Sequence, residues 1–325
     1  MPFRIAHIGA GEWSRYAHGP ALQRLAERSL VSLELICDLQ IERARQFRDL
    51  FQYRLASDNI HAILSEVRPD AIVCTVQPSA TAELVKSLLP LGIPLFIEKP
   101  PGISLAEATS LAAATTAARA FTFVAFNRRS IPSIVRLKAW AAHHSVRFAR
   151  VEMWRTNRLE PEFATGTGIH VLDAIRFLMG NPESIEVEAR PHENSAACDY
   201  LVRLKFAASA IAEVSLMTDT GLRRESYCLT AEGATAEAAL GSAYSSDLCF
   251  QGDRQWVGEA ITEQHSLVGD PLIDGGFLGQ YEEFFQLLAE RAPSTRSLID
   301  AAYSMQLAEA VQMRFSGQLP PLVME

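Results

Sequence analysis

The first 126 residues alternate short apolar runs with helical stretches, and this alternation restricts the fold more than any other feature of the chain. The apolar runs expected to be strands are Arg4–Gly9, Ser32–Cys37, Ala71–Val76, Pro94–Ile97 and Thr122–Phe126. The segments between them that are expected to be helices are Pro20–Arg28, Ile41–Phe51, Ala80–Leu89 and Leu105–Arg119. Continuous apolar strands that alternate with helices form a parallel sheet covered on both faces. The pattern predicts an α/β domain over residues 1–127.

The pattern changes after residue 127. Apolar residues then recur at every second position in several consecutive runs between Ile185 and Leu240, with no helix between the runs. Such runs predict a mainly antiparallel sheet. Helices are expected at Pro132–His143, His170–Met179, Phe277–Glu290 and Asp300–Phe315. We therefore expect an α+β domain over residues 128–325 with an open sheet, and we expect its uncovered face to be buried in a homodimer or homotetramer.

Composition narrows the class of partner. Hydrophobic residues make up 48% of the 325 and charged residues 21%, as in globular proteins, and the formal net charge is −8. A negative surface repels nucleic acid and anionic lipid, and no apolar run reaches the ~20 residues that span a bilayer. The five cysteines form no C-x-x-C pair, so neither a zinc site nor a disulfide framework is indicated. A cytoplasmic protein that binds a small molecule is expected.

The turn after the first strand reads Gly9-Ala10-Gly11-Glu12-Trp13-Ser14. A G-x-G turn between a strand and a helix allows the backbone to approach a pyrophosphate, although Ser14 stands where the full G-x-G-x-x-G pattern has glycine. Asp38 ends the second strand, where a carboxylate accepts hydrogen bonds from the adenosine ribose and repels a 2′-phosphate. The residues predict a Rossmann domain that binds NAD. Arg43 keeps NADP open as an alternative, because it is able to bind the phosphate.

The fourth strand ends in Glu98-Lys99-Pro100. Ligands of open α/β sheets lie beyond the carboxyl ends of the strands, so Lys99 is expected beside the reacting part of the cofactor. A neighbouring positive charge lowers the pKa of a lysine and makes it a candidate acid–base group. A surface ion pair followed by a proline turn is the structural alternative.

Taken in order, these motifs resemble those of a known family. G-x-G, the acid after the second strand, E-K-P, Phe126-Asn127-Arg128-Arg129 and Gly168-Ile169-His170-Val171-Leu172-Asp173 are similar to motifs of the glucose-fructose oxidoreductase and inositol dehydrogenase (Gfo/Idh/MocA) family. The similarity extends over nearly the whole chain, and it implies a Rossmann domain followed by an α+β domain whose open sheet often mediates oligomerisation.

The resemblance also implies roles for single residues. Gly9, Gly11, Asp38 and Glu98 would bind the cofactor, and Lys99 and His170 would face the reacting carbon. Glu12, Trp13 and Gln77 are expected to line the same cofactor site. Two positions depart from the family pattern. Gly166 stands where the family usually has an aspartate, four residues before the histidine, and Val76-Gln77-Pro78 replaces its T-P turn.

Several polar residues are expected to contact substrate. His170 and Asp173 lie three apart and share a helix face, so Asp173 is expected to fix the tautomer of His170. Asn127, Lys99, Arg155 and Asn157 are candidate ligands of substrate hydroxyls or a carboxylate, together with Arg158. His170 as an ordinary interface histidine is the alternative. No cluster of residues has the spacing of a metal site.

These residues predict an NAD-dependent dehydrogenase that transfers a hydride between the cofactor and a secondary alcohol or ketone of a sugar, cyclitol or sugar derivative. Lys99 and His170 would share the proton transfer at the hydroxyl. Two alternatives remain open. One is a reductase of a non-sugar substrate, since biliverdin reductase also resembles this family. The other is a dinucleotide-binding sensor or scaffold without turnover, which Gly166 favours.

Overall fold

The chain folds into two compact units, which we describe from a computed structural model. The structure describes residues 1–240, 253–257, 260–264 and 269–324. The first unit comprises Met1–Phe126 and Phe277–Ala302 with the C-terminal end, and the second comprises Asn127–Gly276 and Tyr303–Leu322.

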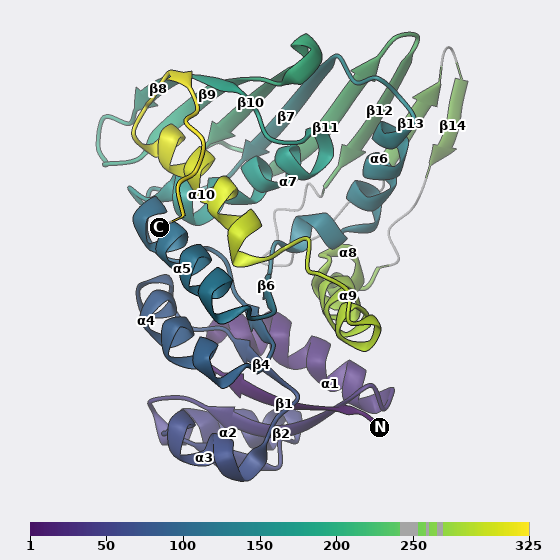
Figure 1. Cartoon of the computed structure of the whole chain (residues 1–325). Coiled ribbons are helices and arrows are strands. Elements are labelled where there is room, and N and C mark those ends of the chain that lie inside the picture. Colours follow the sequence, from purple (N-terminus) through teal and green to yellow (C-terminus); the bar gives the residue numbers. More distant parts are fainter. Residues whose placement is uncertain (241–252, 258–259, 265–268, 325) are drawn as a thin grey trace. The chain divides into compact units, whose positions relative to one another are not determined.

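The first unit contains the predicted parallel sheet (Figure 1). Its six strands have the order β3-β2-β1-β4-β5-β6, and each pairs with its neighbour in parallel. The bounds are β1 (Phe3–Ile8), β2 (Val31–Cys37), β3 (Leu55–Ser57), β4 (Ala71–Cys74), β5 (Leu95–Ile97) and β6 (Thr122–Val124). The connecting helices are α1 (Gly19–Glu27), α2 (Ile41–Phe51), α3 (Ile60–Val67), α4 (Pro78–Leu88) and α5 (Leu105–Ala118). Strands β4, β5 and β6 are buried throughout, which explains their apolar runs.

Two elements of this unit, one strand and one helix, were not expected from the sequence. Strand β3 has only three residues, and all three are half-buried because the strand lies at the edge of the sheet. So short a segment shows no periodicity. Helix α3 follows it, and Asn59 caps its N-terminus by accepting a hydrogen bond from the backbone N–H of Ala62 at 3.1 Å.

A segment from the far end of the sequence completes the first unit. Helix α9 (Phe277–Glu290) packs aromatic rings on the sheet, with Tyr281 stacked on Phe96 at 4.3 Å between ring centroids. The backbone N–H of Val124 at the end of β6 donates to the carbonyl of Arg296 at 2.6 Å. Residues 277–302 were expected in the second domain, and aromatic burial against β5 is the physical reason that they fold with the first.

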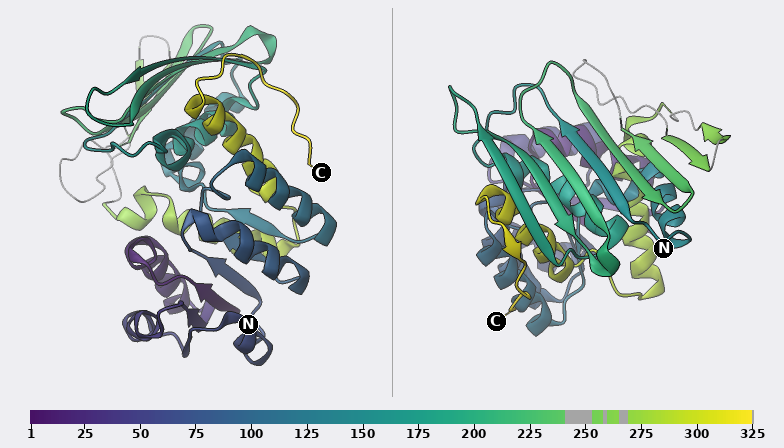
Figure 2. Two further views of the ribbon diagram at one scale, coloured as in Figure 1. Left: turned by 90° about the vertical axis from the view of Figure 1, so that its left-hand side faces the viewer. Right: turned by 90° about the horizontal axis from the view of Figure 1, so that it is seen from above.

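The second unit contains a nine-stranded sheet in the order β14-β13-β12-β11-β7-β10-β9-β8-β15 (Figure 2). The bounds are β7 (Phe148–Trp154), β8 (Ser184–Pro191), β9 (Cys198–Lys205), β10 (Ile211–Met217), β11 (Arg224–Ala231), β12 (Ala234–Ala239), β13 (Asp253–Val257), β14 (Ala260–Gln264) and β15 (Gly317–Gln318). All neighbours pair antiparallel except β7 and β10, which run parallel. The expectation of a mainly antiparallel sheet is confirmed. The helices of this part of the chain are α6 (Pro132–Ala142), α7 (Ile169–Met179), α8 (Pro271–Asp274) and α10 (Leu298–Gln312).

Four of the cysteines lie in described residues. Cys37 and Cys74 end strands of the first sheet and are buried, as expected of cysteines in apolar runs. Burial raises the pKa of both thiols, to about 11 for Cys37 and about 12 for Cys74, so neither is a thiolate near neutral pH. Cys249 lies outside the described residues.

A buried ion pair anchors α7 in the second unit. Asp173 is completely buried, and both of its oxygens accept hydrogen bonds from Arg129, at 2.8 and 2.5 Å. Ser304 Oγ donates to the same carboxylate at 2.6 Å. A buried charge pair of this kind fixes geometry, and removal of either partner leaves the other charge uncompensated.

We therefore predict that Asp173→Asn lowers the free energy of unfolding by about 3 kcal/mol, because the buried Arg129 guanidinium would lose the charge of the carboxylate to which it donates two hydrogen bonds. Urea denaturation followed by circular dichroism measures this. The control is Glu232→Gln, which removes an exposed ion pair with Arg147 and is expected to leave the midpoint unchanged. An Asp173→Asn midpoint equal to that of the control would contradict the prediction.

Candidate functional site

The glycine turn at the end of β1 has room for no side chain at its first position. Gly9 has φ +104°, and a Cβ there would lie 2.6 Å from the carbonyl oxygen of Thr75. The backbone N–H of Gly9 donates to Cys37 O at 2.8 Å, and the N–H of Thr75 donates to Ile8 O at 2.8 Å. The turn is therefore held between β2 and β4, and only glycine fits it.

The second glycine of the turn has the opposite surroundings. A Cβ on Gly11 would meet nothing within 4 Å, so the space over this residue is open for a ligand. The chain continues through a π-helical turn at Ser14–His18 into α1. Such turns are frequent at functional sites. Ser14 Oγ lies 2.6 Å from Thr75 Oγ1, which anchors the turn against β4. Open backbone at a helix start suits a pyrophosphate.

Asp38 faces this turn from the end of β2. Its Oδ2 accepts a hydrogen bond from the backbone N–H of Ala10, and its Oδ1 accepts one from the N–H of Gln40, both at 2.9 Å. Arg43 Nη1 lies 3.8 Å from the carboxylate. Carboxylate oxygens have further acceptor positions, so Asp38 still suits two ribose hydroxyls.

Two adjoining pockets lie along this turn. The first, of about 620 Å³, is bounded by Gly9, Gly11, Asp38 and Gln77 with the start of α3. The second, of about 910 Å³, continues past Gly11 and Gln77 along the turn; Glu12, Trp13 and Arg43 also line it. Every residue expected at the cofactor site except Glu98 lines one or both pockets. Their size and lining fit an extended dinucleotide.

Glu98, at the end of β5, contacts two aromatic residues instead of these pockets. Its Oε1 accepts a hydrogen bond from the indole N–H of Trp13 at 3.0 Å and lies 3.0 Å from His18 Nε2. His18 Nδ1 is in turn 2.7 Å from the Tyr281 hydroxyl on α9. Glu98 thus fixes the Trp13 indole beside the glycine turn. Trp13 lines the second pocket, whereas Glu98 does not. Lys99 follows it, half-buried, before a cis peptide bond to Pro100.

Sequence reasoning missed His18 and Tyr281. His18 lies in the π-helical turn and is completely buried, yet a lone histidine in a helix gives no sign of its partner. Tyr281 is 263 positions away in the chain, and no local pattern connects the two.

In the second unit, His170 is the second residue of α7 and is nearly buried. A second π-helical turn, Ala164–Gly168, directly precedes α7. It contains Gly166, where a Cβ would meet nothing within 4 Å. The position that usually holds an aspartate in the family is therefore open space. Asp173 accepts hydrogen bonds from Arg129 and Ser304, and its expected role toward His170 and the substrate stays a prediction.

Of the other residues expected to bind substrate, two are buried and one is exposed. Asn127 is buried, with Nδ2 donating to Gly275 O at 2.8 Å. Arg155 is buried against Glu225. Both side chains are bound within the fold, and their expected contact with a substrate stays a prediction. Asn157 is exposed, with its backbone N–H bound to Asp219 Oδ1 at 2.8 Å. The expected meeting of Lys99 and His170 at one substrate stays a prediction.

Comparisons with known proteins agree with this architecture. Residues 3–126 match a family model described as an oxidoreductase family, NAD-binding Rossmann fold, and residues 134–318 match its C-terminal alpha/beta domain. A comparison with curated proteins found no match.

Solved structures share the fold at low sequence identity. An oxidoreductase from Agrobacterium radiobacter in complex with NAD⁺, L-tartaric acid and magnesium is 17% identical, with a TM-score of 0.79 over 97% of this chain and 96% of that one. A levoglucosan dehydrogenase in complex with NADH and L-sorbose is 14% identical, with a TM-score of 0.83 over 99% and 100%. A dehydrogenase from Chromobacterium violaceum is 17% identical, with a TM-score of 0.81 over 97% and 95%.

Among the residues that the structure describes, no group of three or more histidine, cysteine or acidic side chains is placed to hold a metal ion. Within the same residues, no helix has both the length and the apolar character needed to cross a membrane.

We predict that the protein binds NAD at least ~10-fold more tightly than NADP, a difference of about 1.4 kcal/mol, because Asp38 repels a 2′-phosphate. Asp38→Asn removes the charge and leaves one oxygen, which can accept from only one of the two backbone N–H groups, and beside Arg43 it is expected to reduce the preference for NAD over NADP. Isothermal titration calorimetry with both cofactors measures it, and Asp49→Asn, a surface acid on α2, is the control. Tighter binding of NADP by the unaltered protein would contradict this interpretation of Asp38.

Proposed function

Because this chain belongs to the Gfo/Idh/MocA family of oxidoreductases, whose N-terminal domain is an NAD-binding Rossmann fold, we propose that it transfers a hydride between NAD and a secondary alcohol of a sugar, cyclitol or sugar derivative. The observation that carries the proposal is the pocket of about 620 Å³ in which the glycine turn faces Asp38. Such a pocket selects a dinucleotide by its pyrophosphate and its ribose hydroxyls.

The chain's own residues have three tasks toward the cofactor. Gly9 and Gly11 keep side chains away from the pyrophosphate, and Asp38 accepts hydrogen bonds from the adenosine ribose. The bound NAD supplies the hydride acceptor, its nicotinamide ring. Trp13, held by Glu98, forms a fixed wall beside this site.

Proton transfer at the substrate is assigned to Lys99 and His170. When the alcohol is oxidised, its carbon loses a hydride and its hydroxyl loses a proton. We propose that Lys99 accepts that proton and that His170 holds the hydroxyl in line. A positioned acid–base group of this kind contributes about 10²–10⁴-fold to the rate. With Gly166 in place of an aspartate, the lysine is the stronger of the two assignments.

The proposed substrate class is based on the ligands bound in two solved structures with the same fold. The levoglucosan dehydrogenase structure holds L-sorbose and the Agrobacterium radiobacter structure holds L-tartaric acid, both polyhydroxylated. We extend this class to the present chain as a proposal, since fold similarity does not identify a substrate. Reduction of NAD across a panel of sugars, polyols and sugar acids, read at the reduced-nicotinamide band, tests it. Cofactor binding without turnover on any member would favour a sensor.

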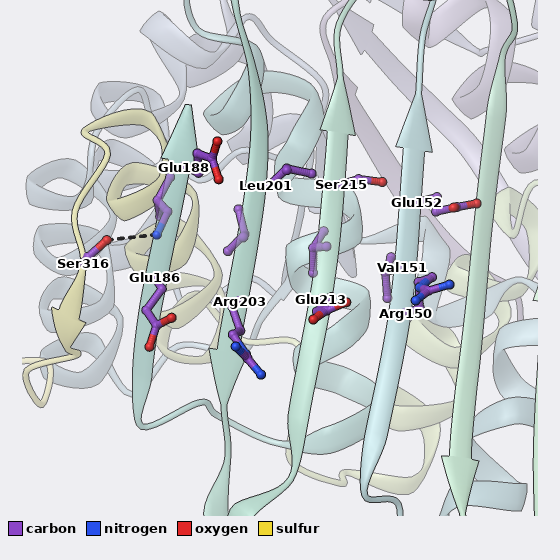
Figure 3. Close-up of a pocket in the computed structure, with 13 residues that line it drawn as sticks. Arg150, Val151, Glu152, Glu186, Glu188, Leu201, Arg203, Glu213, Ser215 and Ser316 are labelled. Atoms are coloured by element: carbon purple, nitrogen blue, oxygen red, sulfur yellow. Dashed lines mark hydrogen bonds between the residues drawn. The ribbon is translucent and has the colours of Figure 1, made fainter. Parts of the chain in front are cut away.

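The open face of the second sheet supports self-association. Four neighbouring strands present a row of alternating charge, in which the paired residues are Glu186, Arg203, Glu213 and Arg150 (Figure 3). A two-fold axis parallel to the strands, between β9 and β10, would place Arg203 of one copy over Glu213 of the other. It would also place Glu186 over Arg150. The row is therefore complementary to itself, as an isologous interface requires.

The catalytic assignment predicts separate effects on turnover and on binding. Lys99→Met and His170→Ala should each lower kcat by at least ~10²-fold, with the larger loss for lysine. The affinity for NAD should change by less than about 1 kcal/mol, because the pyrophosphate and ribose are bound elsewhere. Steady-state kinetics on an identified substrate and calorimetry measure the two quantities. Near-normal turnover of Lys99→Met would show that E-K-P is only a structural turn.

The charge row predicts a dimer or larger assembly at micromolar concentration, measured by light scattering. Arg203→Glu should weaken the assembly, because it places like charges opposite each other, and Arg203→Glu with Glu213→Arg should restore it. Arg147→Glu, an exposed arginine outside the row, is the control. A monomeric unaltered protein would rule out this interface.

A further inference from the structure

Arginine side chains gather where β7 ends and β11 begins in the second unit. Arg224 pairs with Trp154 at the end of the ladder, so Arg223 and Arg155 continue the two strands side by side. Arg155 Nη1 donates to the carbonyl of Arg224 at 3.2 Å, which holds its guanidinium against this corner. Arg128 belongs to the same cluster because it donates a hydrogen bond to Glu225, the residue after Arg224.

Glu225 is the central carboxylate of this cluster, and its acceptor positions are filled. Its Oε1 accepts from Arg128 Nε at 3.1 Å and from the Tyr227 hydroxyl at 2.8 Å. Its Oε2 accepts from Arg128 Nη2 at 3.1 Å and from Arg155 Nη2. Four donors match the four lone-pair positions of a carboxylate. Burial by itself raises the pKa of Glu225, but Arg128 and Arg155 outweigh it and bring the pKa to about 2, so the group stays charged.

A second carboxylate, that of Glu160, also accepts hydrogen bonds from an arginine. Arg158 donates to both oxygens of Glu160, at 2.9 and 3.2 Å from Nε, and to Thr167 Oγ1 at 2.6 Å from Nη2. Thr167 lies in the π-helical turn directly before α7. The arginine cluster is therefore connected to the turn that precedes His170.

Among the residues that the structure describes, Arg223 is the arginine of this cluster without a hydrogen-bonded carboxylate. It is half-buried, and among the residues that the structure describes it makes no hydrogen bond or ion pair. Burial lowers the pKa of Arg223, and the charges of Arg155, Arg128 and Arg158 lower it further, while Glu225 opposes them. A partly desolvated guanidinium beside other cations is unfavourable without an anion.

We propose that Arg223, backed by Arg155 and Arg128, binds an anionic group of the substrate, a carboxylate or a phosphate. The inference rests on the proposed function, and it narrows the substrate class from polyols in general to sugar acids or sugar phosphates. A guanidinium binds either group through paired N–H donors. The chain as a whole carries a formal charge of −8, so attraction of an anion depends on this local cluster.

Binding of matched ligands to the full chain tests the proposal. Isothermal titration calorimetry with NADH present, so that alcohols do not react, compares six-carbon aldonates and alditol phosphates with the corresponding neutral alditols in the gluco, galacto and manno series. We expect at least one charged ligand to bind ~10-fold or more tightly than its alditol, the size of one charge-assisted hydrogen bond. Arg223→Met should remove this advantage, Arg223→Lys should keep part of it, and Arg147→Met is the exposed control.

Each outcome has one meaning. If alditols bind as tightly as their charged counterparts, if no charged ligand binds, or if Arg223→Met leaves charged-ligand affinity unchanged, the anion site is excluded. A loss of affinity confined to charged ligands supports it. Assays of NAD reduction on the same panel separate the two proposals. Selective binding of an anion without any turnover would support the anion site and contradict the dehydrogenase activity. Turnover of neutral alditols alone would support the dehydrogenase activity and contradict the anion site.

Discussion

The hydroxyl of Thr75 is the contact on which the cofactor site depends. Thr75 Oγ1 lies 3.0 Å from Gly9 O and 3.2 Å from Ile8 O, so it binds the carbonyls of the glycine turn. The same oxygen lies 2.6 Å from Ser14 Oγ and 2.8 Å from His7 Nε2. Burial lowers the pKa of His7 well below its usual value, and His18 lowers it further, so the imidazole is neutral at ordinary pH. One half-buried side chain therefore joins β1, β4 and the π-helical turn, and the backbone carbonyl of the same residue leaves Gly9 no room for a side chain.

In the second unit, buried charges have the corresponding role. Asp173 is held by Arg129 and Ser304, and Glu225 by Arg128, Arg155 and Tyr227. Each carboxylate receives several donors, which offsets the cost of taking it out of water. Asp173 orients α7, at whose start His170 lies. Glu225 holds two arginines at the corner where Arg223, among the described residues, has no carboxylate hydrogen-bonded to it. The buried ion pairs of Glu225 thus lie beside Arg223, the candidate anion-binding residue.

Much of the first unit follows from local sequence. The apolar runs placed five of the six strands of the sheet, because strands of a parallel sheet that helices cover on both faces are rich in apolar residues. Gly9, Gly11 and Asp38 come together because the carboxyl ends of neighbouring parallel strands meet at one edge. The edge strand β3 escaped notice because three half-buried residues carry no periodicity. The mainly antiparallel second sheet likewise followed from the period of two.

What the sequence by itself determined was the order of elements and the position of the glycine turn, Asp38 and Lys99 at the ends of strands, since these depend on local periodicity and on strand direction. The tertiary structure alone decided the partners of charged and aromatic side chains. Helix spacing puts His170 and Asp173 on one face. Only the structure shows that Arg129 binds the Asp173 carboxylate, to which it donates two hydrogen bonds. An aromatic helix such as α9 has the same pattern whichever sheet it covers. Arg223 became a candidate ligand only once the pairing of Arg224 with Trp154 brought it beside Arg155.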